Sequence, residues 1–281
     1  METINLFGGK GFVGSQYCKQ TNLKTICNFR NDYEVYDKNV LYLISTVHNY
    51  NVLQNSFVDI DTNLTTLMRI LDNYRKFPGD GCFNFISSWF VYGKDSGYGN
   101  GAVGISENSS CDPKGFYSIT KRCAEQLLMS YCETFNLNYR ILRLCNVIGN
   151  GDKFSAQKNA LQYMLNEIKN GKPVQLYDGG RFYRDYIDVR DCARAIDLVI
   201  QRGELNQIYN IGNGVPQEFG KLIQYAKIVT KSNSEITVIE QKEFHKKVQS
   251  SRSFFMDTHK LKSLGYAPQY SIFDTLDSII D

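Results

Sequence analysis

The feature that most constrains the fold is a glycine cluster close to the N-terminus. A short apolar run at residues 4–7 ends at Gly8, and glycines recur at positions 11 and 14, where a helix-like segment (12–19) begins. In a strand–turn–helix unit, such glycines allow a tight turn, close approach of a pyrophosphate, and close packing of helix on strand. The helix start also presents free N–H groups that favour phosphate. The residues expected to contact a dinucleotide are Gly8, Gly11, Phe12, Val13 and Gly14.

Strand-like and helix-like segments alternate after this turn. Strands are expected at 4–7, 25–29, 40–45, 82–87 and 140–144, and helices at 12–19, 64–73 and 117–135. This alternation predicts right-handed crossovers and an α/β fold with a Rossmann-type, doubly wound parallel sheet. The stretch 30–40 is too short for the helix and strand that are common at this place, so we expect both to be trimmed.

The character of the chain changes near residue 148. We expect residues 1–148 to form the dinucleotide-binding domain, and residues 186–215 to return to it. Residues 149–185 and 216–281 are expected to form a smaller C-terminal substrate-binding lobe. Its predicted elements are helices at 161–169 and 219–230 and a short strand at 174–176. A chain of 281 residues is long enough for this arrangement.

Composition argues against several classes of protein. The 32 basic and 29 acidic side chains nearly balance, which gives no case for nucleic acid or an anionic membrane as partner. No apolar run approaches the roughly 18 residues that span a bilayer, and the N-terminus does not resemble a signal peptide. Eight scattered cysteines without a C-x-x-C pair, and only three histidines, argue against a metal site. We therefore expect a cytoplasmic protein with reduced cysteines.

The residues after the second predicted strand bear on which dinucleotide binds. An acidic residue there would hydrogen-bond the adenosine ribose and favour NAD, a role open to Asp32. Arg30 could instead pair with a 2′-phosphate, which would favour NADP, or be a solvated loop charge. The sequence thus leaves NAD and NADP as alternatives.

A tyrosine and a lysine one helical turn apart are the candidates for proton transfer. Tyr117 and Lys121 share one face at the start of a predicted helix. A phenol with an ordinary pKa of about 10 is a poor base at neutral pH, but a nearby ammonium and an oxidised nicotinamide would favour the phenolate. Ser87 and Ser88 end the preceding strand, at the edge where open α/β sheets bind ligands, and can orient a reacting oxygen.

These motifs together resemble those of the extended short-chain dehydrogenase/reductases, the family of nucleotide-sugar epimerases and dehydratases, and the 4-epimerases of UDP-glucose in particular. The resemblance covers nearly the whole chain. It rests on Gly8-Gly9-Lys10-Gly11-Phe12-Val13-Gly14, Ser87-Ser88-Trp89-Phe90-Val91-Tyr92-Gly93, Tyr117-Ser118-Ile119-Thr120-Lys121, Arg143-Leu144-Cys145-Asn146 and Arg184-Asp185-Tyr186-Ile187. It implies a nucleotide-diphosphate sugar as substrate and a homodimer formed through two helices.

The resemblance also assigns roles to single residues. Ser88 is implied as the catalytic serine beside Tyr117 and Lys121, and Asn63 as a supporting residue near the cofactor. For the substrate, it implies that Arg184 binds the diphosphate and that Asn146 hydrogen-bonds the sugar or the diphosphate. Asn159 and Arg252 are further candidate contacts in the smaller lobe, with surface loop positions as the alternative reading.

The residues after Ser88 separate the possible reactions. Dehydratases of the family carry an Asp-Glu pair there, whereas this chain has Trp89-Phe90, which argues against 4,6-dehydration. The leading hypothesis is a nucleotide-sugar epimerase that transiently oxidises C4 of the sugar and returns hydride to the other face. The first alternative is an NADPH-dependent reductase of nucleotide 4-keto-6-deoxy sugars, favoured by Arg30 and the short chain. The second is a non-catalytic dinucleotide-binding sensor.

Overall fold

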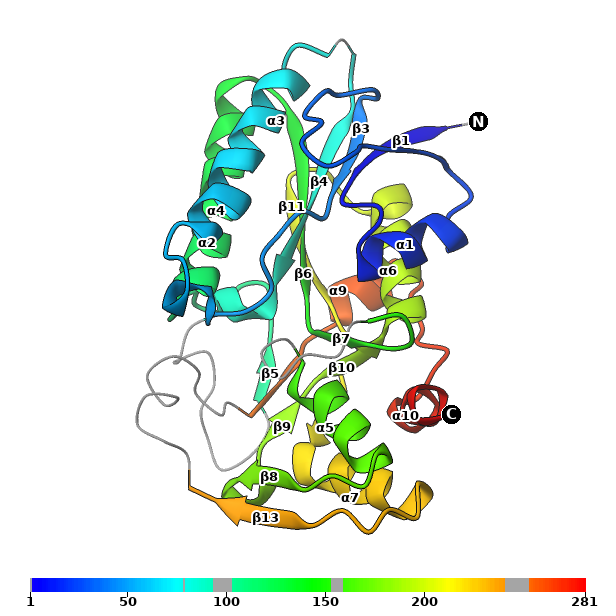
Figure 1. Ribbon diagram of the computed structural model, residues 1–281. Helices are drawn as coiled ribbons and strands as arrows, with labels where there is room; N and C mark the ends of the chain where they lie inside the picture. The colour runs from blue at the N-terminus through cyan, green and yellow to red at the C-terminus, as the bar shows by residue number, and fades with distance from the viewer. Residues whose placement is uncertain (1, 78, 93–102, 153–158, 241–252) are drawn as a thin grey trace.

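The computed structural model describes residues 2–77, 79–92, 103–152, 159–240 and 253–281, which fold around one six-stranded sheet (Figure 1). Neighbouring strands in this sheet are all parallel. In spatial order the strands are β11 (Gln207–Ile211), β6 (Asn138–Leu144), β4 (Cys82–Ser88), β3 (Asn39–Tyr42), β1 (Thr3–Phe7) and β2 (Lys24–Cys27). The predicted doubly wound parallel sheet is confirmed, and its edge strand β11 comes from the second half of the chain.

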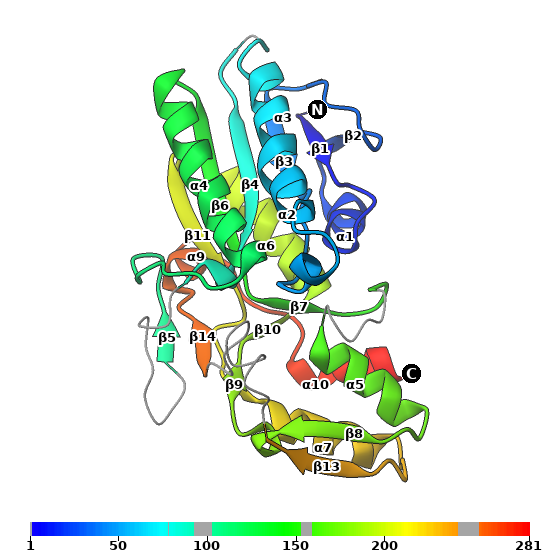
Figure 2. The same ribbon diagram turned by 60° about the vertical axis from the view of Figure 1, so that its left-hand side comes forward.

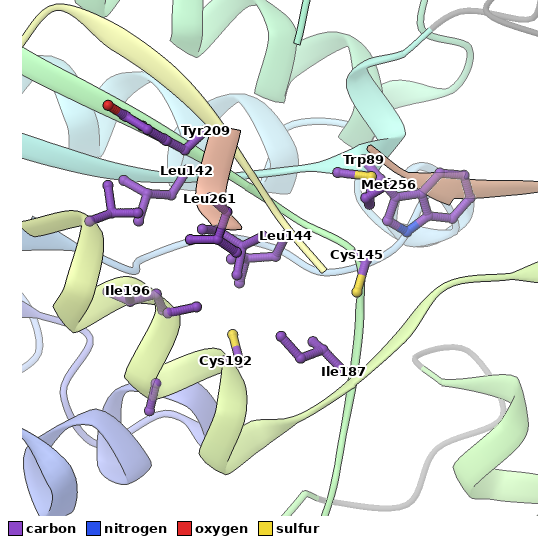
Figure 3. Packing of buried hydrophobic residues seen from close by; sticks show 14 of the residues in the cluster. Trp89, Leu142, Leu144, Cys145, Ile187, Cys192, Ile196, Tyr209, Met256 and Leu261 are labelled. Atoms are coloured by element: carbon purple, nitrogen blue, oxygen red, sulfur yellow. The ribbon is translucent and has the colours of Figure 1, made fainter. Parts of the chain in front are cut away.

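Helices cover both faces of this sheet. Helices α1 (Phe12–Gln20) and α6 (Val189–Arg202) lie side by side on one face, and α3 (Thr66–Tyr74) and α4 (Phe116–Thr134) on the other (Figures 1 and 2). Each helix contributes apolar side chains to a core cluster shared with the strands beneath it. Figure 3 shows Cys192 and Ile196 of α6 in the cluster that also contains Leu142 and Leu144 of β6.

The edge of the sheet at β2 is simpler than in larger dinucleotide folds. No helix or strand lies between Cys27 and Asn39, all of which the structure describes, and β2 is the last strand on this side. The expected trimming is therefore confirmed. Asn28 holds this connection in place, because its side chain donates to Glu34 O at 2.8 Å and accepts from the Asn5 side chain.

A smaller group of elements lies beyond the carboxyl ends of the main strands. It consists of α5 (Ala160–Lys169), α7 (Phe219–Val229), α10 (Ile272–Ile280) and the parallel pair β8 (Val174–Tyr177) and β13 (Ile236–Ile239) (lower part of Figure 1). These elements share their own core of buried residues, among them Leu165, Leu222 and Leu276. Met256 and Leu261, from the segment 216–281 that is expected in the smaller lobe, lie in the same cluster as Leu142 and Leu144 of the main sheet (Figure 3). Phe254 also belongs to this cluster.

Short elements connect the two groups. Three small two-stranded sheets pair β10 (Tyr186–Asp188) with β7 (Asn146–Ile148) in parallel, β14 (Phe254–Met256) with β5 (Val103–Ile105) in parallel, and β12 (Gln217–Glu218) with β9 (Tyr183–Arg184) antiparallel. No helix within the described ranges is both long and apolar enough to cross a membrane. The remaining elements are η1 (Asn51–Leu53), α2 (Val58–Ile60), η2 (Asp61–Thr65), η3 (Trp89–Val91), η4 (Asp178–Gly180) and α9 (His259–Ser263).

Candidate active site

The glycine turn joins β1 to α1 as its spacing predicts. Gly8 adopts a φ of +90°, a left-handed conformation that favours glycine, and Gly11 caps the start of α1. A Cβ atom at Gly14 would lie 2.4 Å from Gly8 O, so this position has no room for a larger side chain. The first N–H groups of an α-helix have no partner within the helix. The turn and the helix start therefore form a cradle for an anion.

One cavity brings the glycine turn together with the candidates for proton transfer. Its volume is about 370 Å³, and it lies at the carboxyl ends of β1, β3, β4 and β6. Of the residues predicted from sequence, those that line it are Gly8, Gly11, Phe12, Val13, Gly14, Ser88, Tyr117, Lys121, Asn146 and Asn159. Residues from the glycine turn and from four later segments thus surround one space, as a site for a dinucleotide and a second ligand requires.

Tyr117 lies in the first turn of α4, next to the end of β4. Gly115 precedes the helix with a φ of +91°, and the Tyr117 side chain is 7% exposed. Burial raises the pKa of Tyr117, while hydrogen bonds from Ser88 and Ser45 act to lower it. The ring of Phe90 meets the Tyr117 ring edge-on at 5.6 Å. The phenol therefore has an apolar side and a side with two hydroxyl groups.

Lys121 is buried one turn further along α4. Its Nζ donates to Ile86 O at 2.6 Å and lies 4.1 Å from the centre of the Phe85 ring. Burial lowers the pKa of Lys121 to about 7, and the charge of Glu125 partly opposes this effect. Burial thus raises the pKa of Tyr117 and lowers that of Lys121, so burial opposes the charged form of both groups. The acidification of the phenol by this amine stays a prediction.

A buried ion pair supports this part of α4. Glu125 and Arg143 are 0% and 1% exposed, and Arg143 donates to the Glu125 carboxylate through Nε at 2.9 Å and Nη2 at 2.8 Å. Arg122 Nη1 donates to the same carboxylate at 2.9 Å. These hydrogen bonds and positive charges hold the pKa of Glu125 below its usual range in spite of burial. The pair joins the helix that carries Tyr117 to strand β6.

Asn63 does not line the cavity, but it hydrogen-bonds Ser45 and Thr46, which do. It belongs to the π-helical turn η2 and is 1% exposed. Its Oδ1 accepts from Ser45 Oγ at 3.1 Å and Thr46 N at 3.0 Å, and its Nδ2 donates to Thr120 Oγ1 at 2.9 Å. Asn63 thereby ties the loop after β3 to α4. Such π-turns often occur at functional sites.

The predicted substrate contacts divide into two groups. Asn146 and Asn159 line the cavity, where Asn146 Nδ2 donates to Asp185 O at 2.9 Å and Asn159 Oδ1 caps α5. Arg184 does not line it. The Arg184 guanidinium lies 4.7 Å from the Phe182 ring centre and 5.4 Å from that of Trp89, which is a lining residue. Arg252 lies outside the described residues.

Arg30 and Asp32, the residues expected to contact the adenosine half of the dinucleotide, do not line the cavity. Arg30 is exposed on the loop after β2. The Asp32 carboxylate accepts from Glu34 N at 3.1 Å and from the Tyr36 hydroxyl at 3.2 Å, so it closes its own loop. Cys27 and Asn28, rather than Asp32, stand at the end of β2.

Several lining residues were missed from the sequence. Ser45 and Thr46 follow β3, and their position at the end of a predicted strand was an available signal. Asp152 brings a carboxyl group to the lining from the loop after β7, and no motif marked it. Within the described ranges, no cluster of three or more His, Cys, Asp or Glu side chains is placed to hold a metal ion.

A parallel sheet with a glycine turn after its first strand, and with serine, tyrosine and lysine around one cavity, defines a protein of the extended short-chain dehydrogenase/reductase type. Within that class, the chain belongs to the NAD dependent epimerase/dehydratase family, whose sequence model matches residues 38–212.

Individual proteins are similar to this chain in sequence or in fold. The "low-salt glycan biosynthesis protein Agl12" of Haloferax volcanii is 31% identical over 180 residues, and the match covers 63% of this chain but only 55% of that protein. The fold is similar to UDP-glucose 4-epimerase of Thermotoga maritima, solved with UDP-glucose (TM-score 0.86, 22% identity, 99% of this chain and 97% of the other). It is also similar to RMD of Pseudomonas aeruginosa, solved with NADPH (TM-score 0.83, 20% identity, 100% and 98%).

Proposed function

We propose that this protein is an NAD(P)-dependent nucleotide-sugar epimerase that acts through transient oxidation at C4 of the sugar. The observation that carries the proposal is the single cavity that joins the glycine turn to Ser88, Tyr117 and Lys121, with Trp89-Phe90 in place of an acidic pair. The proposal is in line with the UDP-glucose 4-epimerase of Thermotoga maritima, which has the same fold.

The glycine turn fits the pyrophosphate of a dinucleotide. The lack of room for a Cβ atom at Gly14 and the position of the turn at the start of α1 are what such a ligand requires. Gly8, Gly11, Phe12, Val13 and Gly14 would hold the phosphates, and Tyr117 and Lys121 would border the nicotinamide half. When bound, the nicotinamide supplies reversible two-electron oxidation of one sugar carbon.

Tyr117 would move the proton. In its ionised form, the phenolate oxygen would take the proton from the sugar hydroxyl when the carbon is oxidised, and the resulting phenol would give it back when the carbon is reduced. Ser88 and Ser45 would orient the reacting oxygen of the sugar, since the hydroxyls of both serines already hydrogen-bond the Tyr117 side chain. Lys121 would hold the nicotinamide ribose, and its charge at neutral pH depends on the balance between burial and Glu125.

The aromatic pair after Ser88 disfavours dehydration. Trp89 stacks on Phe90 with ring centres 4.1 Å apart, and Phe90 faces Tyr117. No carboxyl group adjoins Ser88 in the sequence to protonate a leaving hydroxyl. Among the described lining residues, Asp152, in the loop after β7, is the acidic side chain. We expect Asn146, Asn159, Arg184 and Arg252 to bind the nucleotide-diphosphate sugar.

A reductase of nucleotide 4-keto-6-deoxy sugars is the second candidate. It is favoured by the exposed Arg30 and by Lys10, whose Nζ lies 4.8 Å from the ring centre of Phe29, because these groups could attract a 2′-phosphate. RMD of Pseudomonas aeruginosa, which shares the fold, binds NADPH. Stoichiometric consumption of NADPH with a keto-sugar would support this candidate, since an epimerase recycles its cofactor.

The decisive experiment offers purified protein a panel of nucleotide sugars. Interconversion of a 4-epimer pair without net use of dinucleotide is the expected result. Tyr117→Phe should reduce turnover by about 10²–10⁴-fold, whereas Tyr131→Phe, at the other end of the same helix, should not. If no 4-epimer pair is ever interconverted, the epimerase is excluded. If Tyr117→Phe leaves cellular function intact, a non-catalytic sensor becomes the better account.

We further propose a homodimer through α2 and α4. On α4, Phe116, Ile119 and Leu127 are 42%, 51% and 37% exposed, and on the adjoining segment Phe57 and Ile60 are 64% and 38% exposed. Apolar side chains gathered on neighbouring helices favour association with a second copy.

A further inference from the structure

We propose that Cys18 and Cys27 form a thiol pair that hydrogen peroxide converts reversibly into an intramolecular disulfide beside the glycine turn. The two sulfur atoms lie 3.6 Å apart. Cys18 is partly buried on α1, and Cys27 is the exposed last residue of β2. The pair therefore spans two elements that flank the turn between Phe7 and Phe12.

The positions of the two residues suit a covalent bond. A disulfide brings its sulfur atoms to about 2.0 Å, so these two must approach by roughly 1.6 Å. Their backbones are already held together, because β2 pairs with β1 at Leu6 and Cys27, and α1 follows β1 directly. By contrast, Cys82, Cys132, Cys145 and Cys192 are buried, away from an oxidant in solution.

The exposure of the two thiols assigns the order of the reaction. The Cys27 thiolate attacks one oxygen of hydrogen peroxide, the O–O bond breaks, and a sulfenic acid and hydroxide form. The Cys18 thiolate then attacks the Cys27 sulfur, the S–O bond breaks, and the second oxygen leaves as water. Two thiols lose two electrons and two protons, and peroxide becomes two waters. Burial and the neighbouring Cys27 thiol raise the pKa of Cys18 to about 11, which makes Cys18 the poorer nucleophile for the first step.

The location of Cys27 couples this chemistry to the dinucleotide site. A Cβ atom at Gly9 would lie 2.6 Å from Cys27 Sγ, so the sulfur packs directly against the glycine turn. The end of the second strand is also where dinucleotide folds place the adenosine ribose. A bound dinucleotide would therefore cover Cys27 and slow its oxidation. This coupling, unlike the thiol pair itself, rests on the function proposed above.

The test treats the full chain with hydrogen peroxide, counts free thiols after denaturation, and maps peptides by mass spectrometry. We expect two of the eight thiols to be lost and one peptide linked through Cys18 and Cys27 to appear, with recovery on adding dithiothreitol. Cys18→Ser and Cys27→Ser should each abolish the linked peptide. Cys123 is a partly exposed thiol on α4. The matched control is therefore Cys123→Ser, which should leave the yield of the linked peptide unchanged.

The outcomes separate the thiol pair from the coupling. Absence of the linked peptide in the unsubstituted chain, or oxidation of Cys27 to sulfinic acid alone, would overturn the pair. With NAD or NADPH at ten times its Kd, the rate should fall about tenfold if only the free form reacts. An unchanged rate in spite of measured binding would overturn the coupling but not the proposed function. Failure of both dinucleotides to bind would overturn the coupling and the proposed function, while the linked peptide would still support the pair.

Discussion

Glu125→Gln tests whether the buried ion pair holds the helix that carries Tyr117. The substitution removes the charge and keeps the shape of the side chain, so Arg143 loses the counter-charge that it contacts at 2.9 and 2.8 Å. Arg143 is 1% exposed and cannot turn to water without a structural change. The guanidinium thus remains buried with its charge uncompensated.

The expected loss of stability follows from that burial. Removing one partner of a buried ion pair lowers the free energy of unfolding by about 3–5 kcal/mol. In chains approaching this size, a loss of one kcal/mol lowers Tm by about 2–4 °C, so Tm should fall by roughly 10 °C. The same substitution removes the charge that opposes the lowering of the pKa of Lys121. The pKa of Lys121 should then fall below about 7, and Lys121 should lose its proton at a lower pH than in the unsubstituted protein.

Thermal unfolding followed by circular dichroism at pH 7 measures the effect. Glu167→Gln is the control, because Glu167 pairs with the exposed Lys172 at 3.4 Å and such pairs contribute less than about 1 kcal/mol. The double variant Glu125→Gln/Arg143→Met should regain most of the lost stability, since no uncompensated charge remains. A Tm for Glu125→Gln equal to that of Glu167→Gln would refute the reasoning.

Three further results are expected. Gly14→Ala should weaken dinucleotide binding in calorimetry and cost about 1–3 kcal/mol of stability, because its Cβ would lie 2.4 Å from Gly8 O; unchanged affinity would contradict the cradle. The pKa of Lys121 is lowered to about 7, so the folded state loses stability as pH falls from the ordinary lysine range to about 7 and no more below it. Lys121→Met should therefore reduce the pH dependence of unfolding in that range, and an identical pH profile would exclude the assignment. Ile119→Glu should convert a dimer to a monomer in light scattering, whereas a dimer that persists would place the interface elsewhere.

Local patterns in the sequence predict much of the sheet. The prediction of the glycine turn is confirmed. The positive φ of Gly8 and the lack of space at Gly14 are set by residues only a few positions away in the chain. The helix predicted at 64–73 is confirmed over its apolar part, which is α3, but the helical run extends back through η2 and α2 to Val58. The apolar pattern does not show these first turns, because they carry buried polar groups such as Asp59 and Asn63. These residues are buried through hydrogen bonds to the loop after β3, which no periodicity reveals.

Other features depend on contacts between distant segments. Asp32 is close in sequence to the end of β2, yet the turn at Asn31, with a φ of +66°, and the hydrogen bond of Asn28 to Glu34 O direct it into its own loop. A different kind of omission concerns α10, whose capping box between Ser271 and Asp274 is a local signal that was available in the sequence.

The ionisation of Tyr117 depends on a competition that sequence spacing cannot rank. Spacing places an amine one turn from a phenol and suggests that the phenol becomes acidic. In the folded protein, burial raises the pKa of Tyr117 and lowers that of Lys121, and Lys121 Nζ donates to Ile86 O. The two hydroxyls of Ser45 and Ser88 do not reverse the shift. Because the surrounding side chains raise the pKa of Tyr117, its proposed action as a base would require an additional positive charge from a bound ligand, which would link proton transfer to an occupied site.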